Sequence, residues 1–266
     1  MKGIARGFTL IEISIFLAVT GALFAAVTVG VQNSIYQQRY NDTVQSFADF
    51  LGNLYAEVAN VQSDIDGGRK DGAIYGKLVT FGEEVAGDGN EGKQVIHVYN
   101  VIGKATNSWD TASGNTLELL KGLDANVLRD EDNSYRTVGY AETYTPKWVA
   151  KVQGEEFEDF EGSLLIVRNP KSGTIQTFAM DDVVEVSKYL EPSNYVSGKN
   201  VFEYAEEKNY LTERFVPKTV DFCINPNGDG EYSNRMNVRL IANAHDASGV
   251  EIISFDNNDS KCRSGD

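Results

Sequence analysis

The sequence predicts an α+β protein in which a long N-terminal helix is packed on an antiparallel β-sheet. Apolar residues fill the run from Phe8 to Val31 and then recur at helical spacing to about Val61. Beyond Gly68 the pattern changes to short runs of β-branched and aromatic residues, which turn-forming residues separate. One long helix followed by antiparallel strands is typical of the α+β class.

The chain of 266 residues is acidic, with 39 Asp and Glu against 24 Lys and Arg and a formal net charge of -15. An acidic surface repels a phosphate backbone, so we expect no nucleic-acid partner. The two histidines, His97 and His245, and two cysteines leave little material for zinc or acid–base chemistry. No Pro- or Ser-rich linker follows the helix, so we expect one globular domain at residues 69–266.

A short basic leader precedes an apolar segment of membrane-spanning length. Met1–Gly7 contains Lys2 and Arg6 but no acid, and the run from there to Val31 contains one charge, Glu12. About 20 apolar residues suffice to cross a bilayer, and the basic leader would stay on the cytoplasmic side. A secretory signal peptide has a shorter apolar region without acids. A plain membrane anchor does not explain Glu12, because a charge inside a spanning helix is costly and usually functional.

The segment Gly7–Phe8–Thr9–Leu10–Ile11–Glu12 resembles the processing site of type IV prepilins and type II secretion pseudopilins. The resemblance implies a pilin-like fold with a leader at residues 1–7 and a helix at residues 8–62, of which 8–31 is transmembrane. It also implies that prepilin peptidase cuts after Gly7 and methylates the new amine of Phe8. Glu12, five residues into the mature chain, matches a hallmark glutamate of the family.

The resemblance implies a structural protein, neither an enzyme nor a cofactor binder. The chain would be a subunit, more specifically a minor pilin, of a type IV pilus or related filament. Its implied partners are prepilin peptidase, other pilin subunits, an assembly ATPase, a platform protein and, before assembly, membrane lipid. The precursor would cross the cytoplasmic membrane once, and the mature protein would join an extracellular or periplasmic filament. The alternatives are a pseudopilin of a type II secretion or competence system and, from another class, a membrane-anchored extracellular hydrolase.

Within such a filament, the Glu12 carboxylate would meet the Phe8 amine of a neighbouring subunit. An unpaired charge in an apolar surrounding is far more costly than a paired one, so this pair would fix the register of subunits. In the competing interpretation, Glu12 is neutral in the bilayer and stabilises nothing.

The second half of the helix is amphipathic. Its apolar residues recur at steps near three and four and form one face, which we expect to pack on the protein's own sheet. The helix is expected to end near Ser63–Gly68, where two glycines stop it. The predicted face contains Val31, Ile35, Tyr40, Val44, Phe47, Leu51, Leu54, Tyr55 and Val58.

The predicted strands include two hairpins. The first joins Ser163–Arg168 to Thr174–Ala179 through a turn with Pro and Gly, and the second joins Asn237–Ala242 to Val250–Phe255. Two further segments could be short helices or loops, Val183–Leu190 and Val201–Leu211. The remaining expected strands are Ala73–Phe81, Gln94–Ile102, Tyr135–Tyr144 and Trp148–Val152.

Cys223 and Cys262 both lie in the part expected outside the membrane, where two thiols of one domain are usually oxidised together. Pilins often close their C-terminal region with a disulfide, so the resemblance implies a bond between these two residues. Two free or buried thiols are the alternative.

Asn225, Asn227 and Asp229 match the first half of a calcium-binding loop, with oxygen side chains at alternate positions. Met236 occupies the position at which such a loop needs a bidentate glutamate. A turn is therefore the preferred interpretation, and a calcium site is the alternative.

Two other strings resemble binding motifs. Residues 87–92 fit the spacing G-x-G-x-x-G, but they precede a predicted strand and contain acids, so they do not predict dinucleotide binding. Residues 155–161 (EEFEDFE) are interpreted as a solvated loop or helix end, with a docking site for a basic partner as the alternative.

Overall fold

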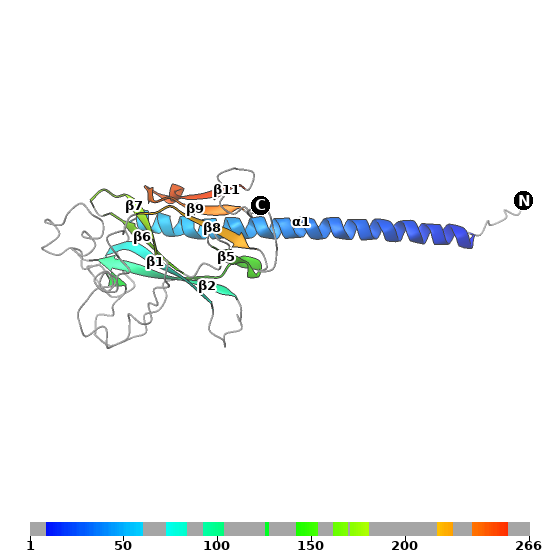
Figure 1. Cartoon of the computed structure of the whole chain (residues 1–266), viewed down its shortest axis with the longest axis horizontal. Helices are drawn as coiled ribbons and strands as arrows, with labels where there is room; N and C mark the ends of the chain where they lie inside the picture. The colour runs from blue at the N-terminus through cyan, green and yellow to red at the C-terminus, as the bar shows by residue number, and fades with distance from the viewer. Residues whose placement is uncertain are drawn as a thin grey trace, which may run out of the picture. The chain divides into compact units, whose positions relative to one another are not determined.

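The computed structural model describes residues 9–60, 73–83, 93–103, 126–127, 142–153, 162–169, 171–180, 217–225 and 236–254. The chain divides into two compact units, Met1–Asp42 and Thr43–Asp266. One long helix precedes antiparallel sheets, which confirms the α+β class expected from the sequence (Figure 1).

The helix α1 spans Leu10–Ala59, compared with the expected range 8–62. It is long and apolar enough to cross a membrane. In the first unit its large apolar side chains are exposed; Leu10, for example, is 83% exposed and Phe24 is 76% exposed. These side chains therefore have no partner within the described part of their own unit.

Two antiparallel sheets are found among the described residues, compared with the single sheet expected. In sheet A the strand order is β10-β7-β6-β1-β2-β3, and β4 also pairs with β2; in sheet B the order is β11-β9-β8-β5. The strands of sheet A are β1 (Ala73–Glu83), β2 (Gln94–Gly103), β3 (Asn126–Val127), β4 (Glu142–Tyr144), β6 (Ser163–Arg168), β7 (Ile175–Met180) and β10 (Asn243–Ala244). Those of sheet B are β5 (Lys151–Gln153), β8 (Val220–Asn225), β9 (Asn237–Leu240) and β11 (Val250–Ile253).

Both predicted hairpins are confirmed. Strands β6 and β7 pair antiparallel, with Arg168 opposite Ile175. Their turn is closed by Asn169, whose Oδ1 accepts hydrogen bonds from the backbone N–H groups of Lys171 and Ser172, each at 2.9 Å. Gly173 has a φ of 75°, which glycine adopts without a steric penalty. The second hairpin pairs β9 with β11 through the single-turn 3-10 helix η3 (Ala247–Gly249).

One strand was missed and one prediction was partly wrong. No strand was predicted at residues 220–225, which form β8, a strand buried along its whole length. The expected strand Trp148–Val152 begins instead with a 3-10 turn, η2 (Lys147–Val149), in which Trp148 takes the left-handed backbone values φ 60° and ψ 28°. Such values are uncommon for a residue other than glycine, so the strand starts only at Lys151.

Several predictions concern residues outside the described ranges. These are residues 87–92, most of Tyr135–Tyr144, residues 155–161, Val183–Leu190 and Val201–Leu211.

The second half of α1 supplies the helical part of the core. Val44, Phe47, Leu51, Leu54, Tyr55 and Val58 are each 0% or 1% exposed. Val31 and Ile35 were expected on the same buried face but are 51% and 42% exposed. In the structure, the buried face of the helix starts at Thr43, the first residue of the second unit.

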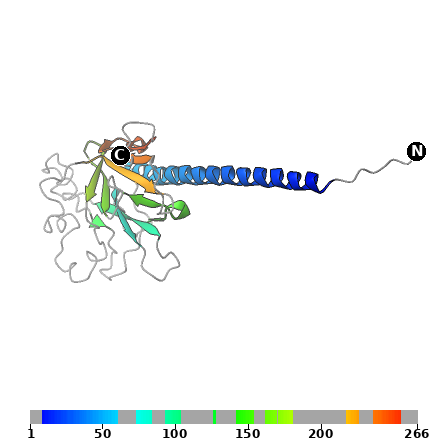
Figure 2. The ribbon, with the colours of Figure 1, turned by 45° about the vertical axis from the view of Figure 1, so that its right-hand side comes forward.

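Aromatic contacts join this half of α1 to both sheets. The ring of Phe47 lies edge-on to Phe222 of β8, at 5.7 Å between centroids, and 6.0 Å from Tyr144 of β4. The two sheets also meet directly, since Phe81 of β1 stacks on Phe222 at 5.4 Å. Strands of both sheets are accordingly seen beside this half of the helix when the molecule is turned (Figure 2).

Among the described residues, Tyr55 is the largest fully buried side chain. Its hydroxyl forms a hydrogen bond with the Thr177 hydroxyl on β7, and Thr177 also donates to the carbonyl of Ile241. Burial raises the pKa of Tyr55 to about 12, against a smaller lowering by the bond to Thr177. Gly249 packs so closely on Tyr55 that a Cβ there would lie 2.6 Å from the ring.

The C-terminal end of α1 is bonded to sheet A. Arg168 Nη1 on β6 donates a hydrogen bond of 2.8 Å to the carbonyl of Ala59, the last residue of the helix. The last carbonyls of a helix lack partners within it, and a cation there also suits the helix dipole.

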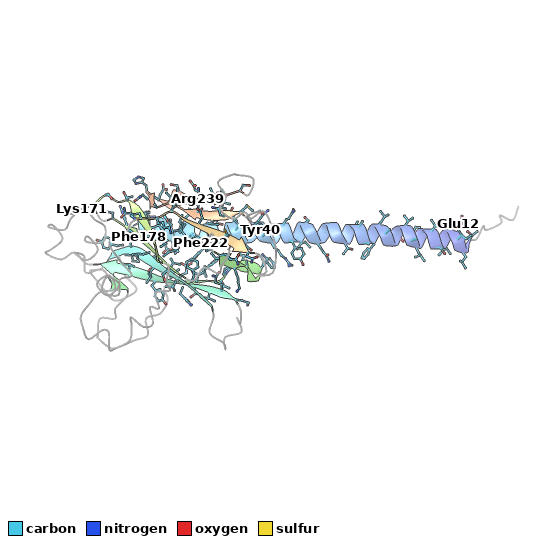
Figure 3. All side chains as sticks on the ribbon, viewed as in Figure 1. Glu12, Tyr40, Lys171, Phe178, Phe222 and Arg239 are labelled. Atoms are coloured by element: carbon cyan, nitrogen blue, oxygen red, sulfur yellow. The ribbon has the colours of Figure 1, made fainter. Side chains whose placement is uncertain are left out.

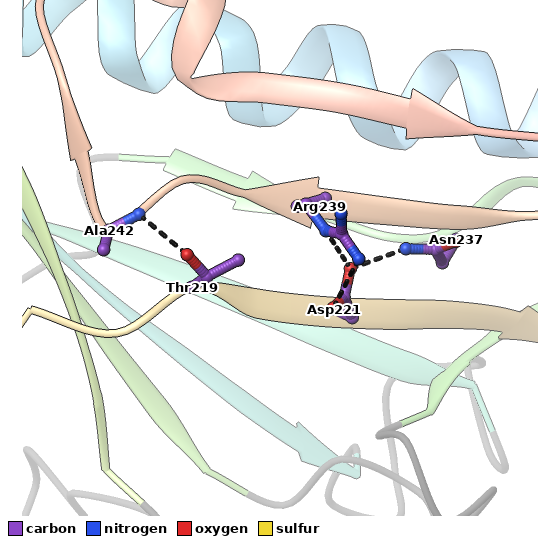
Figure 4. A network of polar contacts seen from close by, with 5 residues as sticks. All are labelled: Thr219, Asp221, Asn237, Arg239 and Ala242. Carbon is purple, nitrogen blue, oxygen red and sulfur yellow. Dashed lines mark hydrogen bonds and ion pairs between the residues drawn. The ribbon is translucent and has the colours of Figure 1, made fainter. Parts of the chain in front are cut away.

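Strands β8 and β9 are linked by a polar network (Figure 4). Asp221, which is 6% exposed, accepts hydrogen bonds from Arg239 Nε at 2.8 Å and from Asn237 Nδ2 at 2.6 Å. Thr219, which directly precedes β8, accepts a hydrogen bond at its Oγ1 from the backbone N–H of Ala242, at 3.3 Å. A carboxylate this deeply buried needs such partners, so the network fixes the pairing of the two strands.

Candidate functional site

The N-terminal end of α1 is closed by reciprocal hydrogen bonds between Thr9 and Glu12, the residue labelled at the start of the helix in Figure 3. Glu12 Oε2 accepts from the Thr9 backbone N–H at 2.8 Å and from the Thr9 hydroxyl at 2.9 Å. In return, the Glu12 backbone N–H donates to Thr9 Oγ1 at 3.3 Å. This arrangement is a capping box, which satisfies N–H groups that the first turn leaves without partners.

The capping box gives Glu12 a role within its own chain that was not expected. A Thr-x-x-Glu pattern before an apolar run is the sequence signature of such a box, and it could have identified Thr9 as a second functional residue. Both bonds to the carboxylate end on Oε2, and Oε1 has no partner among the described residues. The carboxylate therefore keeps one oxygen for a further donor.

The other polar side chains of the apolar half are satisfied inside the helix. The hydroxyls of Ser14, Thr20 and Thr28 each donate at 2.8 Å to the carbonyl four residues earlier. Glu12 is the only Asp, Glu, Lys, Arg or His in residues 8–38. Because lipid offers no hydrogen-bond partners, Glu12 is the one side chain of this segment whose charge calls for a partner outside the helix.

The remaining predicted site residues are only partly described. The expected processing site, Gly7 and Phe8, lies outside the described residues. Cys223 lies in β8 and is 0% exposed, whereas Cys262 lies outside the described residues, so the bond between them stays a prediction.

Of the three residues of the possible calcium site, the structure describes only Asn225. Asn225 is the last residue of β8 and is 5% exposed, while Asn227 and Asp229 lie outside the described residues. No group of three or more His, Cys, Asp or Glu that could hold a metal ion is found in the described part of the chain.

The fold and this site define a class of chain: an α+β protein whose N-terminal helix is long and apolar enough to span a membrane and carries one acid in its first turn. A scan against protein-family models and searches of the curated proteins and of the solved structures find no match to this chain.

Proposed function

We propose that this chain is a structural subunit, specifically a minor pilin, of a type IV pilus or related filament. The observation that carries the proposal is the position of Glu12, an acid in the first turn of an apolar helix and five residues beyond the Gly7–Phe8 junction. The exposed apolar side chains of α1 support it, because they need lipid before assembly and other helices afterwards. About 200 residues follow the helix, which favours a minor over a major pilin.

In the proposed cycle, the precursor crosses the cytoplasmic membrane once with its basic leader inside. Prepilin peptidase removes residues 1–7 and methylates Phe8. The assembly ATPase and platform protein then move the subunit from lipid into the filament, where its helix packs among those of other pilin subunits.

At assembly, the Glu12 carboxylate accepts a hydrogen bond from the cationic Phe8 amine of a neighbouring subunit. The geometry of the capping box supports this step, because Oε2 holds Thr9 and leaves Oε1 for the amine. Charge pairing offsets the cost of burying both groups in an apolar surrounding.

A disulfide between Cys223 and Cys262 belongs to the same proposal. It would hold the C-terminal tail to sheet B. The complete burial of Cys223, and the absence of a free thiol among the described residues, support it.

The N-terminus of the mature protein tests the proposal directly. Mass spectrometry of protein from sheared filaments and from membranes should find Phe8 as the first residue, carrying one methyl group. Met1 intact in assembled material would contradict the proposal, and a cut near Ala25 would instead indicate ordinary secretion.

A pair of variants separates the registry role of Glu12 from its role as a cap. Glu12→Gln keeps an oxygen that can accept from Thr9 but removes the charge. Thr9→Ala removes both hydrogen bonds of the Thr9 hydroxyl, and keeps the charge and the bond from the residue 9 backbone N–H to Oε2. The ratio of subunit in filaments to subunit in membranes should fall strongly for Glu12→Gln and much less for Thr9→Ala, with cleavage verified in both. An equal fall of the ratio in both variants would mean that Glu12 acts only as a helix cap. An unchanged ratio in Glu12→Gln and Glu12→Ala would mean that Glu12 does not set the register of subunits.

A further inference from the structure

A second polar cluster lies in the second unit, where α1 meets sheet A. Lys77 of β1 is 4% exposed, and its Nζ lies 2.5 Å from Glu57 Oε2 of α1. The same Nζ donates a hydrogen bond of 2.7 Å to Oδ1 of Asn100, which lies directly opposite Lys77 on β2. Glu142 of β4 pairs with Val98, two residues before Asn100, and so lies on the same face of the sheet. The proposed function makes no use of this cluster.

The cluster brings together the components of an amide-forming reaction. A lysine amine is a nucleophile once it has lost its proton, and a carboxylate in contact with it is a suitable base. The Asn100 side chain offers a carboxamide carbon, bonded to the oxygen that Lys77 already contacts. Burial raises the pKa of the Glu142 carboxyl, and the charge of Glu57 raises it further while that of Lys77 lowers it. Glu142 therefore keeps its proton to a higher pH than an ordinary glutamate does.

From this geometry we infer that Lys77 and Asn100 form an intramolecular isopeptide bond. The Lys77 ammonium passes one proton to the Glu57 carboxylate, and Nζ then attacks Cγ of Asn100. The Nζ–Cγ bond forms and the Cγ–Nδ2 bond breaks. A second proton moves from Nζ through the carboxyl groups to Nδ2, which leaves as ammonia. No electron is gained or lost, and no other reactant is consumed.

Two physical effects favour this reaction. The β1–β2 register holds the amine against the carboxamide, which replaces an encounter in solution by a fixed contact. The product is a neutral amide in place of a buried ammonium ion, so the cost of keeping that charge out of water disappears. The bond ties together the two strands with the most extensive pairing in sheet A, from Ala73–Gly103 to Glu83–Gln94.

Intact-mass spectrometry of the full chain tests the inference. The protein is extracted in detergent, reduced and denatured, and its mass is compared with that of the processed sequence. We expect a deficit of one ammonia and, after proteolysis, a branched peptide that contains both Lys77 and Asn100. Lys77→Arg and Asn100→Ala should each restore the full mass, and Glu57→Gln should leave a larger unlinked fraction. Lys171→Arg, at an exposed lysine, should keep the deficit.

Two controls make the result specific. The sequence contains Asn227–Gly228, and an Asn-Gly pair can also lose ammonia by forming a succinimide. That ring opens in mild alkali and does not depend on Lys77, whereas the isopeptide bond survives alkali and requires Lys77.

If Lys77→Arg fails to fold, Asn100→Asp provides the second test, because a linked aspartate loses water in place of ammonia. Full mass in folded wild type, with Lys77 and Asn100 on separate peptides, would overturn the inference and leave an ordinary ion pair. This outcome is independent of whether the chain assembles into a filament.

Discussion

Tyr55→Phe removes one hydroxyl from the centre of the core and leaves the ring in place. In the wild type this hydroxyl is bonded to Thr177, which keeps a second bond to the Ile241 carbonyl when the first is lost. A buried hydrogen bond contributes about 1 kcal/mol net to stability. At neutral pH we therefore expect the variant to be less stable than the wild type by about 1 kcal/mol.

The pH dependence of this difference follows from the raised pKa. Tyr55 has a pKa of about 12 in the folded chain, compared with about 10 for an unfolded tyrosine. Because the folded state holds the proton more tightly, its stabilising effect is fully present below the unfolded value and is lost as the pH rises towards 12. The loss amounts to about 1.4 kcal/mol at pH 11, since each unit of pKa corresponds to about 1.4 kcal/mol. Phenylalanine does not titrate, so the variant escapes this loss.

Urea unfolding of the full chain in detergent, followed by tryptophan fluorescence, measures both effects. The disadvantage of Tyr55→Phe at pH 8 should vanish or reverse at pH 11. Tyr36→Phe, at a tyrosine that is 47% exposed, is the matched control and should change little at either pH. A stability difference that is the same at both values would refute the account of Tyr55 as a buried neutral hydroxyl.

Three further predictions concern the second unit. Thiol labelling of the native chain without reductant should find neither Cys223 nor Cys262 reactive; ready labelling of both would exclude the disulfide. Gly249→Ala would place a methyl group 2.6 Å from the Tyr55 ring and should destabilise the unit by about 1–3 kcal/mol, measured by urea unfolding; an unchanged midpoint would mean that the ring moves aside at little cost. Arg168→Ala removes the hydrogen bond to the last carbonyl of α1 and should cost about 1 kcal/mol, with faster amide exchange in the last turn of the helix; exchange as slow as in the wild type would show that the bond does not hold the helix end.

Local chemistry explains which parts of the fold were predictable. The β6–β7 hairpin follows from Asn169 and Gly173, whose side-chain bonds and positive φ form the turn whatever surrounds it. Strand β8 is different, because one of its two pairing partners, β5, comes from a distant part of the chain. The left-handed Trp148 has no sequence signature, since tryptophan rarely takes that conformation.

The candidate site, like the fold, was predictable only in part. Glu12 stands out in the sequence as a charge in an apolar run, whereas Thr9 required recognition of a pattern that spans the helix boundary. Apolar residues recur on both sides of residue 43, so the periodicity of α1 does not show that burial of the helix begins there. The Lys77 cluster depends on register, which brings Asn100 opposite Lys77 and Glu142 onto the same face.

The hydroxyl groups within the apolar half of α1 keep the same hydrogen bonds whether lipid chains or apolar protein side chains surround the helix. Ser14, Thr20 and Thr28 carry their acceptors with them, in the carbonyls of their own helix. Passage from lipid chains to a protein interior therefore breaks no hydrogen bond along most of the segment. In the proposed filament, the change in hydrogen bonding between the two surroundings is therefore concentrated at one oxygen atom, Oε1 of Glu12, and a single donor to that atom distinguishes the protein interior from lipid.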